Sequence, residues 1–363
     1  MHVSLCNLQR LHAPLRTRID AAIARVIDCG RFIGADVVEG FEARFAARVG
    51  ATHAVAVSSG TDALLASLMA LEVAPGDEVI TTAFTFAAPA QAIARLGAQP
   101  VFVDIDPATF ALDVACVEAA VTERTVGILP VHLFGQMADM RALSDLARRR
   151  GLWIVEDAAQ AVGARELGRH AGTFGATGCF SFFPTKTLGA MGDGGIVVTD
   201  SDHVAATLRR IRHHGAEPKY VHHILGGNFR LDALQAAILD VKLDALDGWL
   251  SARAANAAFY DARFPDLAPM VARENEHAWH QYVLRSPARD AVRAQLLARG
   301  VETAIYYPAT LDRQPCFATS GRVVGTLEVA HRAADEVFAI PVGPELDAAE
   351  RAWVADQLAE VLE

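Results

Sequence analysis

The sequence predicts an α/β protein with a large, mostly parallel sheet and a smaller α+β unit after it. Two observations predict this fold. Short apolar runs alternate with stretches of helical periodicity over the first two-thirds of the chain, and this alternation stops near residue 231. The runs are almost continuously apolar, which is typical of parallel strands buried on both faces. We therefore expect helices on both sides of the sheet.

Seven strands are expected in the large unit, at 54–58, 78–82, 100–104, 126–131, 152–156, 178–183 and 195–199. Stretches with a 3.6-residue period predict helices at 62–72, 87–97, 114–122, 138–150 and 202–212. Pro-Gly-Asp at 75–77 and Asp-Ile-Asp-Pro at 104–107 are typical of turns. The last two strands are joined by a glycine-rich loop rather than a long helix, so we expect that pair to be antiparallel.

The chain changes character after the large unit. Residues 231–264 predict one or two long helices, and strands are expected at 278–286 and 301–306. Further helices are expected at 288–299, 325–338 and 347–361, with a proline-rich loop at 308–315. We place the domain boundary after residue 240, which gives a large domain at 1–240 and a small C-terminal domain at 241–363.

Composition excludes several classes of protein. The chain has 363 residues and a net charge of −10, so it lacks the basic footprint of a nucleic-acid-binding protein. No apolar run approaches the roughly 20 residues that a membrane span needs. The N-terminus does not resemble a signal peptide, and the five cysteines are scattered singly. These features predict a cytoplasmic protein with reduced thiols and no bound metal.

Three strand ends carry unusual polar residues, in the place where parallel α/β sheets bind ligands. The first is Ser58-Ser59-Gly60-Thr61-Asp62, which opens a predicted helix. Small residues and a helix N-terminus can bind an anion through backbone N–H groups. A plain helix cap formed by Ser59 or Thr61 explains this segment equally well.

The second strand end is Glu156-Asp157, which follows the apolar run LWIV. An acid in this position is costly to bury unless it meets a positive partner, such as a protonated ring nitrogen or Mg²⁺. A solvated turn is the alternative interpretation. From these residues alone, the two interpretations stay open.

The third strand end leads to Lys186, between an apolar strand and a glycine-rich turn. Partial burial there would lower the pKa of the lysine and free its amine as a nucleophile or base. The segment is neither a Walker loop nor a GxGxxG fingerprint, because its glycines precede a strand. An ordinary surface lysine is the alternative.

Taken together, the three strand ends supply an anion cradle, an acid for a ring nitrogen and an amine, which are the groups that pyridoxal 5′-phosphate (PLP) requires of a protein. The ordered motifs also resemble those of the DegT/DnrJ/EryC1/StrS family of PLP-dependent nucleotide-sugar aminotransferases, which have aminotransferase fold type I. The resemblance covers essentially the whole chain. Its motifs are SSGTDAL (58–64), GDEVITTAFTF (76–86), VFVDIDPATF (101–110), PVHLFGQMADM (130–140), VEDAAQAVGA (155–164), FSFFPTKTLGAMGDGG (180–195) and NFRLDALQAAIL (228–239).

The resemblance implies a role for each matching residue. Lys186 matches the Schiff-base lysine, and Asp157 matches the acid that holds the proton of the pyridine nitrogen. The other cofactor-binding positions are a phosphate-binding turn with a hydroxyl donor, a residue near the 3-oxygen of the cofactor, and an aromatic side chain stacked on the ring. They correspond to Gly60 and Thr61, Ser181, Gln160 and Phe86, respectively.

Asn228 matches a residue that reaches the cofactor phosphate of the neighbouring subunit, so the resemblance implies a homodimer with shared active sites. Arg230 and Tyr306 are candidates for contacts with the sugar or its diphosphate. The implied reaction moves an amino group from L-glutamate to a keto sugar linked to dTDP or UDP, with pyridoxamine 5′-phosphate (PMP) as the aminated cofactor.

The motif at 180–195, the segment at 219–232 and the Tyr306-Tyr307-Pro308 loop resemble the branch of the family that aminates C3 of the sugar. Three alternatives remain: a 4-keto sugar aminotransferase, a dehydratase of the same family, and a regulatory relative that binds a nucleotide sugar without catalysis. The dehydratase carries His in place of the lysine, and a non-catalytic relative would be expected to lose Lys186 or Asp157. Phe229 and Tyr306 depart from the common family pattern, so the motifs leave the sugar open.

Overall fold

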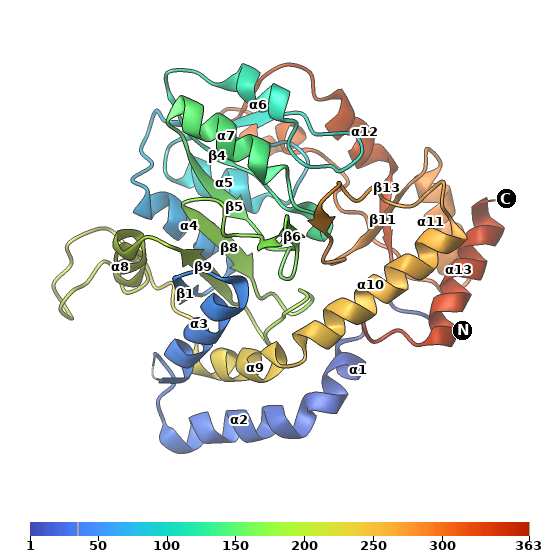
Figure 1. The fold of residues 1–363 in the computed structure, drawn as a ribbon, viewed down its shortest axis with the longest axis horizontal. Helices are drawn as coiled ribbons and strands as arrows, with labels where there is room; N and C mark the ends of the chain where they lie inside the picture. Colours follow the sequence, from blue (N-terminus) through green and yellow to red (C-terminus); the bar gives the residue numbers. More distant parts are fainter. Residues whose placement is uncertain (35, 363) are drawn as a thin grey trace.

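The computed structural model describes residues 1–34 and 36–362. Its centre is an eight-stranded sheet with the strand order β1-β9-β8-β5-β4-β2-β3-β12 (Figure 1). All seven strands expected in the large unit are present, and β12, from the C-terminal part of the chain, adds a short eighth strand beside β3. The strands are β1 His53–Val57, β2 Glu78–Thr82, β3 Gln99–Val103, β4 Thr125–Leu129, β5 Trp153–Asp157, β8 Thr177–Ser181, β9 Gly195–Thr199 and β12 Arg322–Val323.

One strand of this sheet runs against the others. β9 pairs antiparallel with both β1 and β8, whereas the remaining pairs are parallel. The expectation of an antiparallel pair is therefore confirmed. Ser181, at the end of β8, pairs with Gly195, at the start of β9, so the loop between them lies at the carboxyl edge of the parallel strands. The loop that carries Lys186 is held at that edge as a result.

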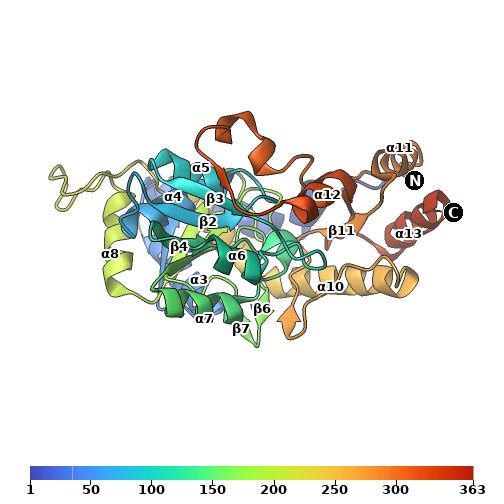
Figure 2. The ribbon, with the colours of Figure 1, turned by 90° about the horizontal axis from the view of Figure 1, so that it is seen from above.

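Helices cover both faces of the sheet, and alternate residues of each strand point to opposite faces. In β1, Ala54 and Ala56 belong to one buried cluster, whereas Val55 and Val57 belong to another. The first cluster also holds residues of α2, α3, α6, α7 and α9, and the second holds residues of α4, α5 and α8. Figure 2 shows the layers from above. The helices are α1 Leu8–His12, α2 Arg16–Cys29, α3 Asp36–Val49, α4 Gly60–Ala70, α5 Ala88–Arg95, α6 Val114–Ala120, α7 Met140–Arg150, α8 Asp202–Ile211 and α9 Ala233–Leu243.

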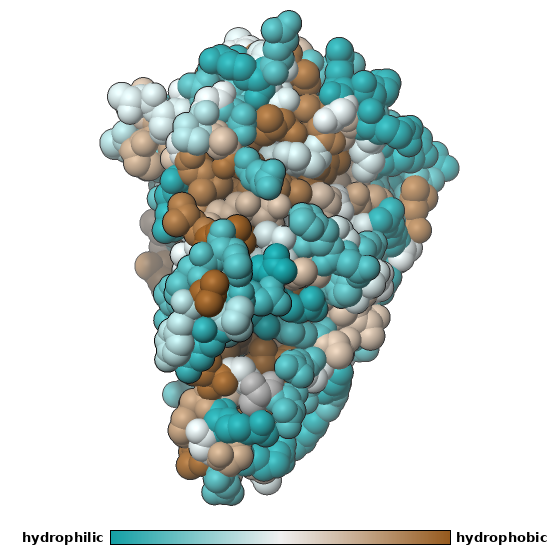
Figure 3. Space-filling model, turned by 90° about the vertical axis from the view of Figure 1, so that its left-hand side faces the viewer, coloured by the Kyte–Doolittle hydropathy of each residue, from teal (hydrophilic) through white to brown (hydrophobic). Residues whose placement is uncertain are grey.

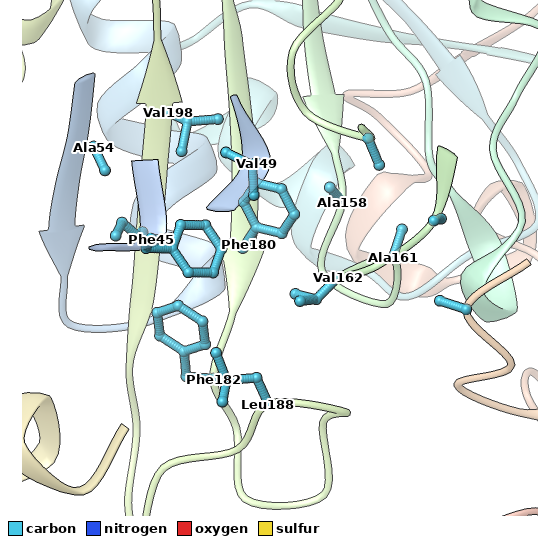
Figure 4. Packing of buried hydrophobic residues seen from close by; sticks show 14 of the residues in the cluster. Phe45, Val49, Ala54, Ala158, Ala161, Val162, Phe180, Phe182, Leu188 and Val198 are labelled. Atoms are coloured by element: carbon cyan, nitrogen blue, oxygen red, sulfur yellow. The ribbon is translucent and has the colours of Figure 1, made fainter. Parts of the chain in front are cut away.

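Aromatic side chains form the centre of the first cluster (Figure 4). Phe45 of α3 packs edge-on against Phe180 and Phe182, with ring centroids 5.1 and 5.5 Å apart. Leu188, two residues after Lys186, is fully buried in the same cluster. The loop that carries the lysine is therefore anchored in the core by its own apolar side chain.

The C-terminal part begins with α10 Leu246–Arg263, which leads away from the sheet toward α11 Arg289–Ala298 and α13 Ala348–Leu362 (Figure 1). Between these helices, β11 Tyr282–Arg285 pairs antiparallel with β13 Val337–Ile340. The N-terminal segment packs here, since Val3 pairs with Val301. The remaining elements are α12 Glu328–Glu336, the small sheet of β6 Arg165–Glu166, β7 Arg169–His170 and β10 Asn275–Glu276, and short 3₁₀ helices at Ala13–Leu15, Leu133–Gly135, Leu311–Arg313 and Pro315–Phe317.

Several expectations for the C-terminal part need correction. The helix expected at 325–338 ends at Glu336, because the apolar run from Val337 forms β13. The strand expected at 301–306 is absent from the described structure, where this segment makes only single bridges from Val301 and Ala304. The strand expected at 278–286 is shorter, at Tyr282–Arg285. The domain boundary after residue 240 stays a prediction.

Among the described residues, no helix is long and apolar enough to cross a membrane. The five cysteines are unpaired thiols, and Cys179 is buried. The described part of the chain also contains no cluster of three or more His, Cys, Asp or Glu side chains suited to a metal ion.

Candidate active site

A cavity of about 500 Å³ opens at the carboxyl edge of the sheet. Its walls come from the segments that follow β1, β2, β4, β5 and β8, together with residues of the C-terminal part. Side chains far apart in the sequence therefore meet where parallel α/β sheets bind ligands. Eight of the ten predicted site residues line this cavity: Gly60, Thr61, Phe86, Asp157, Gln160, Ser181, Lys186 and Tyr306.

The segment after β1 forms a concave end to the cavity at the N-terminus of α4. Ser59 caps this helix, because its Oγ accepts a hydrogen bond of 3.0 Å from the Asp62 amide. A Cβ atom at Gly60 would lie 2.7 Å from Cβ of Ser181, so only glycine lets the two segments approach this closely. The helix terminus adds partial positive charge beside the Ser181 hydroxyl. This end of the cavity suits a phosphate group.

Asp157 places a carboxylate in the wall of the cavity at the end of β5. Its side chain is only 5% exposed and accepts a 3.0 Å hydrogen bond from the Ala159 amide. Burial raises the pKa of Asp157, while the Ala159 N–H and the nearby Lys186 and His132 act in the opposite direction. A buried carboxylate with so little compensation favours a positively charged partner.

Glu156, the neighbouring acid, faces the other side of β5, as the alternation of strand residues requires. It is fully buried and accepts hydrogen bonds from His132 Nε2 and from the amides of Gly172, Phe174 and Gly175. His132 Nδ1 accepts a hydrogen bond from the Ala138 amide, so the ring proton is on Nε2, which donates it in the hydrogen bond to Glu156. Of the two acids at this strand end, Asp157 is therefore the one that lines the cavity.

Lys186 enters the cavity from the loop between β8 and β9. The loop closes on itself through hydrogen bonds from Lys186 N to Phe183 O and from Ala190 N to Phe182 O. Burial lowers the pKa of Lys186 to about 8, and the charge of Asp157 opposes this decrease. The amine can thus exchange a proton near neutral pH, as a nucleophile or general base must.

Gln160 is fixed by both ends of its amide. Its Oε1 accepts a 2.6 Å hydrogen bond from the Phe134 amide, and its Nε2 donates to the Tyr307 hydroxyl at 3.2 Å. Tyr307 lines the cavity but was not among the residues predicted from sequence. The sequence signal that could have identified Tyr307 is its position next to Tyr306, which is itself a predicted site residue. Gln281 is a second lining residue that sequence reasoning missed.

Aromatic rings surround the open side of the cavity. Phe86 is 57% exposed, and its ring centroid lies 5.9 Å from that of Tyr307. Tyr306 packs edge-on against Tyr307 with centroids 5.8 Å apart. The three rings come from two segments separated by more than half of the chain. They form an apolar wall suited to a flat ring.

Asn228 and Arg230 do not line this cavity. They lie on an extended segment beside β1, in which Asn228 bridges to His213 and Arg230 bridges to Val57. Asn228 is exposed. The buried Nε of Arg230 makes no hydrogen bond within the described chain.

A second cavity of about 470 Å³ lies between the segments that lead into α6 and α7 and the segment at 270–275. Four of its five acids accept hydrogen bonds from the local backbone: Asp113 and Asp139 cap α6 and α7, and Glu166 accepts from the Met140 amide. Asp106 likewise accepts from the Ala108 and Thr109 amides. Because these carboxylates already have partners, the cavity at the sheet edge is the better candidate for catalysis.

Comparison with protein families gives one match over nearly the whole chain. Residues 14–359 match the model of the DegT/DnrJ/EryC1/StrS aminotransferase family. Three curated relatives each align with nearly their full length. A pleiotropic regulatory protein of Geobacillus stearothermophilus is 46% identical, covering 99% of this chain and 98% of the relative. The dTDP-3-amino-3,4,6-trideoxy-alpha-D-glucose transaminase of Streptomyces venezuelae is 43% identical, covering 99% and 96%. The UDP-N-acetyl-3-dehydro-alpha-D-glucosamine 3-aminotransferase of Acidithiobacillus ferrooxidans is 41% identical, covering 99% and 98%.

Solved structures agree with the fold. The X-ray structure of DesV from S. venezuelae in complex with a ketimine intermediate has a TM-score of 0.95 at 43% identity, covering 98% of this chain and 96% of that chain. The crystal structure of NtdA from Bacillus subtilis with bound cofactor PMP has a TM-score of 0.91 at 30% identity, covering 99% and 85%. The expected aminotransferase fold is therefore confirmed.

Proposed function

The chain belongs to the DegT/DnrJ/EryC1/StrS aminotransferase family, and on that premise we propose that it transfers an amino group from L-glutamate to C3 of a keto sugar linked to dTDP or UDP. One observation carries the proposal: Lys186 and Asp157 line a single cavity that ends in the Gly60–Ser181 cradle. The relatives named for transamination of dTDP- and UDP-linked sugars support the substrate class.

The residues of the cavity fit PLP. The cradle at the N-terminus of α4 would hold the phosphate, and the buried Asp157 carboxylate would face the ring nitrogen. Phe86 would lie against the ring, and Gln160 would lie near its 3-oxygen. When bound, PLP supplies an electron-accepting ring and an aldehyde that combines with amines.

The chain's own residues supply charge and proton transfer. Asp157 would hold a proton on the ring nitrogen, because an ionised carboxylate in this buried position is stabilised by a cationic neighbour. Lys186 would hold the cofactor through its amine and would act as the base and acid that carries a proton between two carbon atoms on either side of a nitrogen, which is a 1,3-proton shift. Its pKa of about 8 suits it to both accept and donate that proton near neutral pH.

Arg230 and Tyr306 remain candidates for recognition of the substrate. Tyr306 lines the open part of the cavity, where a sugar could approach Lys186. Arg230 would act from the segment beside β1, where its guanidinium could bind a diphosphate. A 4-keto sugar is the alternative substrate, since the cavity residues that fit PLP do not select a carbon of the sugar.

A regulatory role without catalysis is the second candidate function, because one relative is named a pleiotropic regulatory protein. The presence of both Lys186 and Asp157 favours catalysis. Binding of a nucleotide sugar alone requires neither the amine nor the buried carboxylate.

The test is a substrate screen with purified protein, PLP and L-glutamate. Nucleotide-linked 3-keto and 4-keto hexoses would be offered separately, and the aminated carbon would be assigned by NMR. We expect product with amination at C3, and none with the Lys186→Ala variant. Amination at C4 alone would overturn the choice of carbon, and binding of the sugars without 2-oxoglutarate formation would favour the regulatory role.

We further propose that two copies of the chain form a homodimer with shared sites. The segment between α8 and α9 projects from the body of the molecule (Figure 2), and Tyr220 and Leu225 on it are 79% and 89% exposed. Figure 3 views the molecule from this side and shows apolar patches among hydrophilic side chains. Asn228 lies at the end of this segment and is exposed, and in the dimer it would reach the cofactor phosphate of the partner.

Co-expression of two inactive variants tests the shared site. Lys186→Ala disables its own site, and Asn228→Asp places a negative charge beside the phosphate of the neighbouring site. In a mixed dimer both changes can fall in one site and leave the other intact, so up to roughly half of the wild-type activity should return. A mixed dimer no more active than either parent would show that Asn228 does not serve the partner.

We also propose that the protein is located in the cytoplasm. Five free cysteines without any disulfide are typical of a reducing compartment.

A further inference from the structure

Lysine is rare in this protein. The sequence has three lysines, Lys186, Lys219 and Lys242, against thirty arginines. Lys186 lines the cavity, and Lys219 is exposed. Lys242, on α9, is only 1% exposed, although it is a long cationic side chain. A buried ammonium group is costly unless hydrogen bonds compensate, so its contacts indicate what it does.

The amine of Lys242 makes two hydrogen bonds. It donates to the carbonyl oxygen of Gly189 at 2.6 Å and to His12 Nε2 at 2.7 Å. Burial and the charge of Lys242 lower the pKa of His12 to about 4, so the imidazole is neutral at pH 7 and can accept this bond. Burial lowers the pKa of Lys242 itself to about 8. The lysine thus links α1, α9 and the loop that carries Lys186.

Gly189 is a sensitive point of that loop. A Cβ atom there would lie 2.3 Å from the carbonyl oxygen of Pro184, so the backbones on either side of Lys186 are in close contact. Displacement of Gly189 would therefore move Pro184 and change the direction from which Lys186 enters the cavity. The hydrogen bond from Lys242 restrains the loop at this residue.

A second residue of α9 holds the same loop. Gln235 Oε1 accepts from the Met191 amide at 2.9 Å, and its Nε2 donates to the Met191 carbonyl at 3.3 Å. Gln235 and Lys242 are seven residues apart, which places them two turns apart on one face of the helix. The helix therefore binds the loop at two points, of which the Lys242 contact is closer to Lys186 in sequence.

We propose that Lys242 is a positioning residue: through the Gly189 carbonyl, and with His12 as its second acceptor, it holds the loop that presents Lys186 to the cavity. The proposal rests on the role assigned to Lys186 in the proposed function. It also gives the N-terminal segment a part in the site, because His12 of α1 accepts from Lys242. An Arg10–Glu350 ion pair of 2.6 Å in turn ties α1 to the C-terminal part.

The first test measures Lys186 directly. Full-length protein labelled with ¹³Cε-lysine should give three lysine signals, and each can be titrated with pH before and after addition of PLP. In Lys242→Met and in His12→Ala, a looser loop should expose Lys186 to water, and its pKa in cofactor-free protein should rise by about half a unit or more. The Lys219 signal serves as an internal reference that should not move.

The second test separates positioning from stability. With saturating PLP, Lys242→Met should lower kcat by roughly tenfold or more while KM for the sugar changes by about twofold or less. Lys242→Gln keeps an N–H donor and should recover part of the loss. Arg18→Met is the matched control, because Arg18 is an exposed cation that pairs with Asp244 just beyond α9 and does not contact the loop.

Each outcome decides the proposal. If Lys242→Met folds less stably but leaves both the Lys186 titration and kcat unchanged, Lys242 only stabilises the fold and the proposal is wrong. If Lys242→Met does not fold, His12→Ala decides in the same way, since His12 is only half-buried. If no variant and no wild-type protein transaminates but the Lys186 titration shifts as expected, the proposed function fails while the positioning role stands.

Discussion

Strand β5 ends in two neighbouring carboxylates whose surroundings differ sharply. Glu156 is fully buried and receives four hydrogen bonds, one from His132 and three from backbone amides. Asp157 is almost as buried and accepts a bond from the Ala159 amide. Both groups cost free energy to bury, but the protein's own donors offset more of that cost at Glu156, which receives four hydrogen bonds, than at Asp157, whose carboxylate receives the one from Ala159.

The difference indicates that, at the end of β5, Glu156 serves to stabilise the fold and Asp157 serves the active site. Glu156 holds the loop at 172–175 in place through its hydrogen bonds to that loop, and its carboxylate needs no further partner. The aspartate side is incomplete without a cationic ligand, which is what an active-site acid requires. We therefore expect changes on the Glu156 side to alter folding and changes on the Asp157 side to alter catalysis, and four substitutions test this division.

The largest effect is expected for Lys186→Ala, on the cavity side. The change removes the amine that we propose binds the cofactor and moves the proton, so kcat should fall by at least about 10³-fold. Stability should change little, because Lys186 lines the cavity rather than packing in the core. Single-turnover kinetics with L-glutamate, alongside urea unfolding, measures both. Turnover near that of the wild type would rule out the role assigned to Lys186.

Asp157→Asn should have the next largest effect and should act in opposite directions on activity and stability. The half-reaction with L-glutamate should slow by roughly 10²-fold or more, because the amide cannot hold the ring-nitrogen proton as a carboxylate does. Burial raises the pKa of Asp157, so the folded chain binds this proton more tightly than the unfolded chain. Raising the pH through that pKa therefore costs stability.

Cofactor-free Asp157→Asn lacks this titration and should unfold at a higher temperature than cofactor-free wild type at pH 7. The advantage should shrink as the pH falls and the wild-type carboxylate becomes protonated. Thermal unfolding at several pH values measures it. A variant less stable than the wild type at pH 7 would mean that the ionised carboxylate already has a partner in the protein.

Glu156→Gln is the matched change on the other side of the strand. The neutral amide replaces one accepting oxygen by a donor that faces backbone N–H groups, so the free energy of unfolding should fall by about 2–4 kcal/mol. Urea unfolding measures this loss. In the fraction that remains folded, kcat per bound PLP should stay within about threefold of the wild type. A specific loss of kcat without a loss of stability would contradict the division.

Gly60→Ala should give the smallest effect. The added methyl group would lie 2.7 Å from Cβ of Ser181, so one of the two segments must shift. A cost of about 1–2 kcal/mol in the cradle would weaken PLP binding by roughly tenfold or more while leaving kcat at saturating PLP nearly unchanged. Fluorescence titration with PLP gives the Kd. An unchanged Kd would place the phosphate elsewhere in the cavity.

Much of the large unit could be predicted from sequence because its signals are local. Each strand is a short apolar run between turns. A short run that is apolar at nearly every position is typical of a strand buried on both faces of a parallel sheet, so the sequence alone identifies it. The same logic failed at Val337–Ile340, where a strand follows α12 without a turn signal and so resembles a continuation of the helix. The bridges of Val301 and Ala304 involve partners from both ends of the chain, which no local pattern reveals.

The site divides in the same way. Residues on strand ends, such as Asp157 and Ser181, are placed by the topology of the sheet and could be anticipated. The period-2 alternation of β5 also suffices to place Glu156 and Asp157 on opposite faces of the strand. Tyr307 and Gln281 reach the cavity from outside the large sheet, so their positions depend on tertiary packing. The hydrogen bond from Lys242 to Gly189 likewise joins residues 53 positions apart, so it too depends on tertiary packing.

The scarcity of lysine has a practical consequence for labelling. Aldehydes and ketones form imines with amines, whereas the guanidinium groups that carry most of this protein's positive charge stay protonated and do not react in this way. Only Lys219 among the lysine side chains is exposed on the surface. Reduction of the PLP-treated protein with borohydride should therefore attach close to one cofactor per chain, and the peptide that contains exposed Lys219 is the one lysine peptide that could compete with the Lys186 peptide.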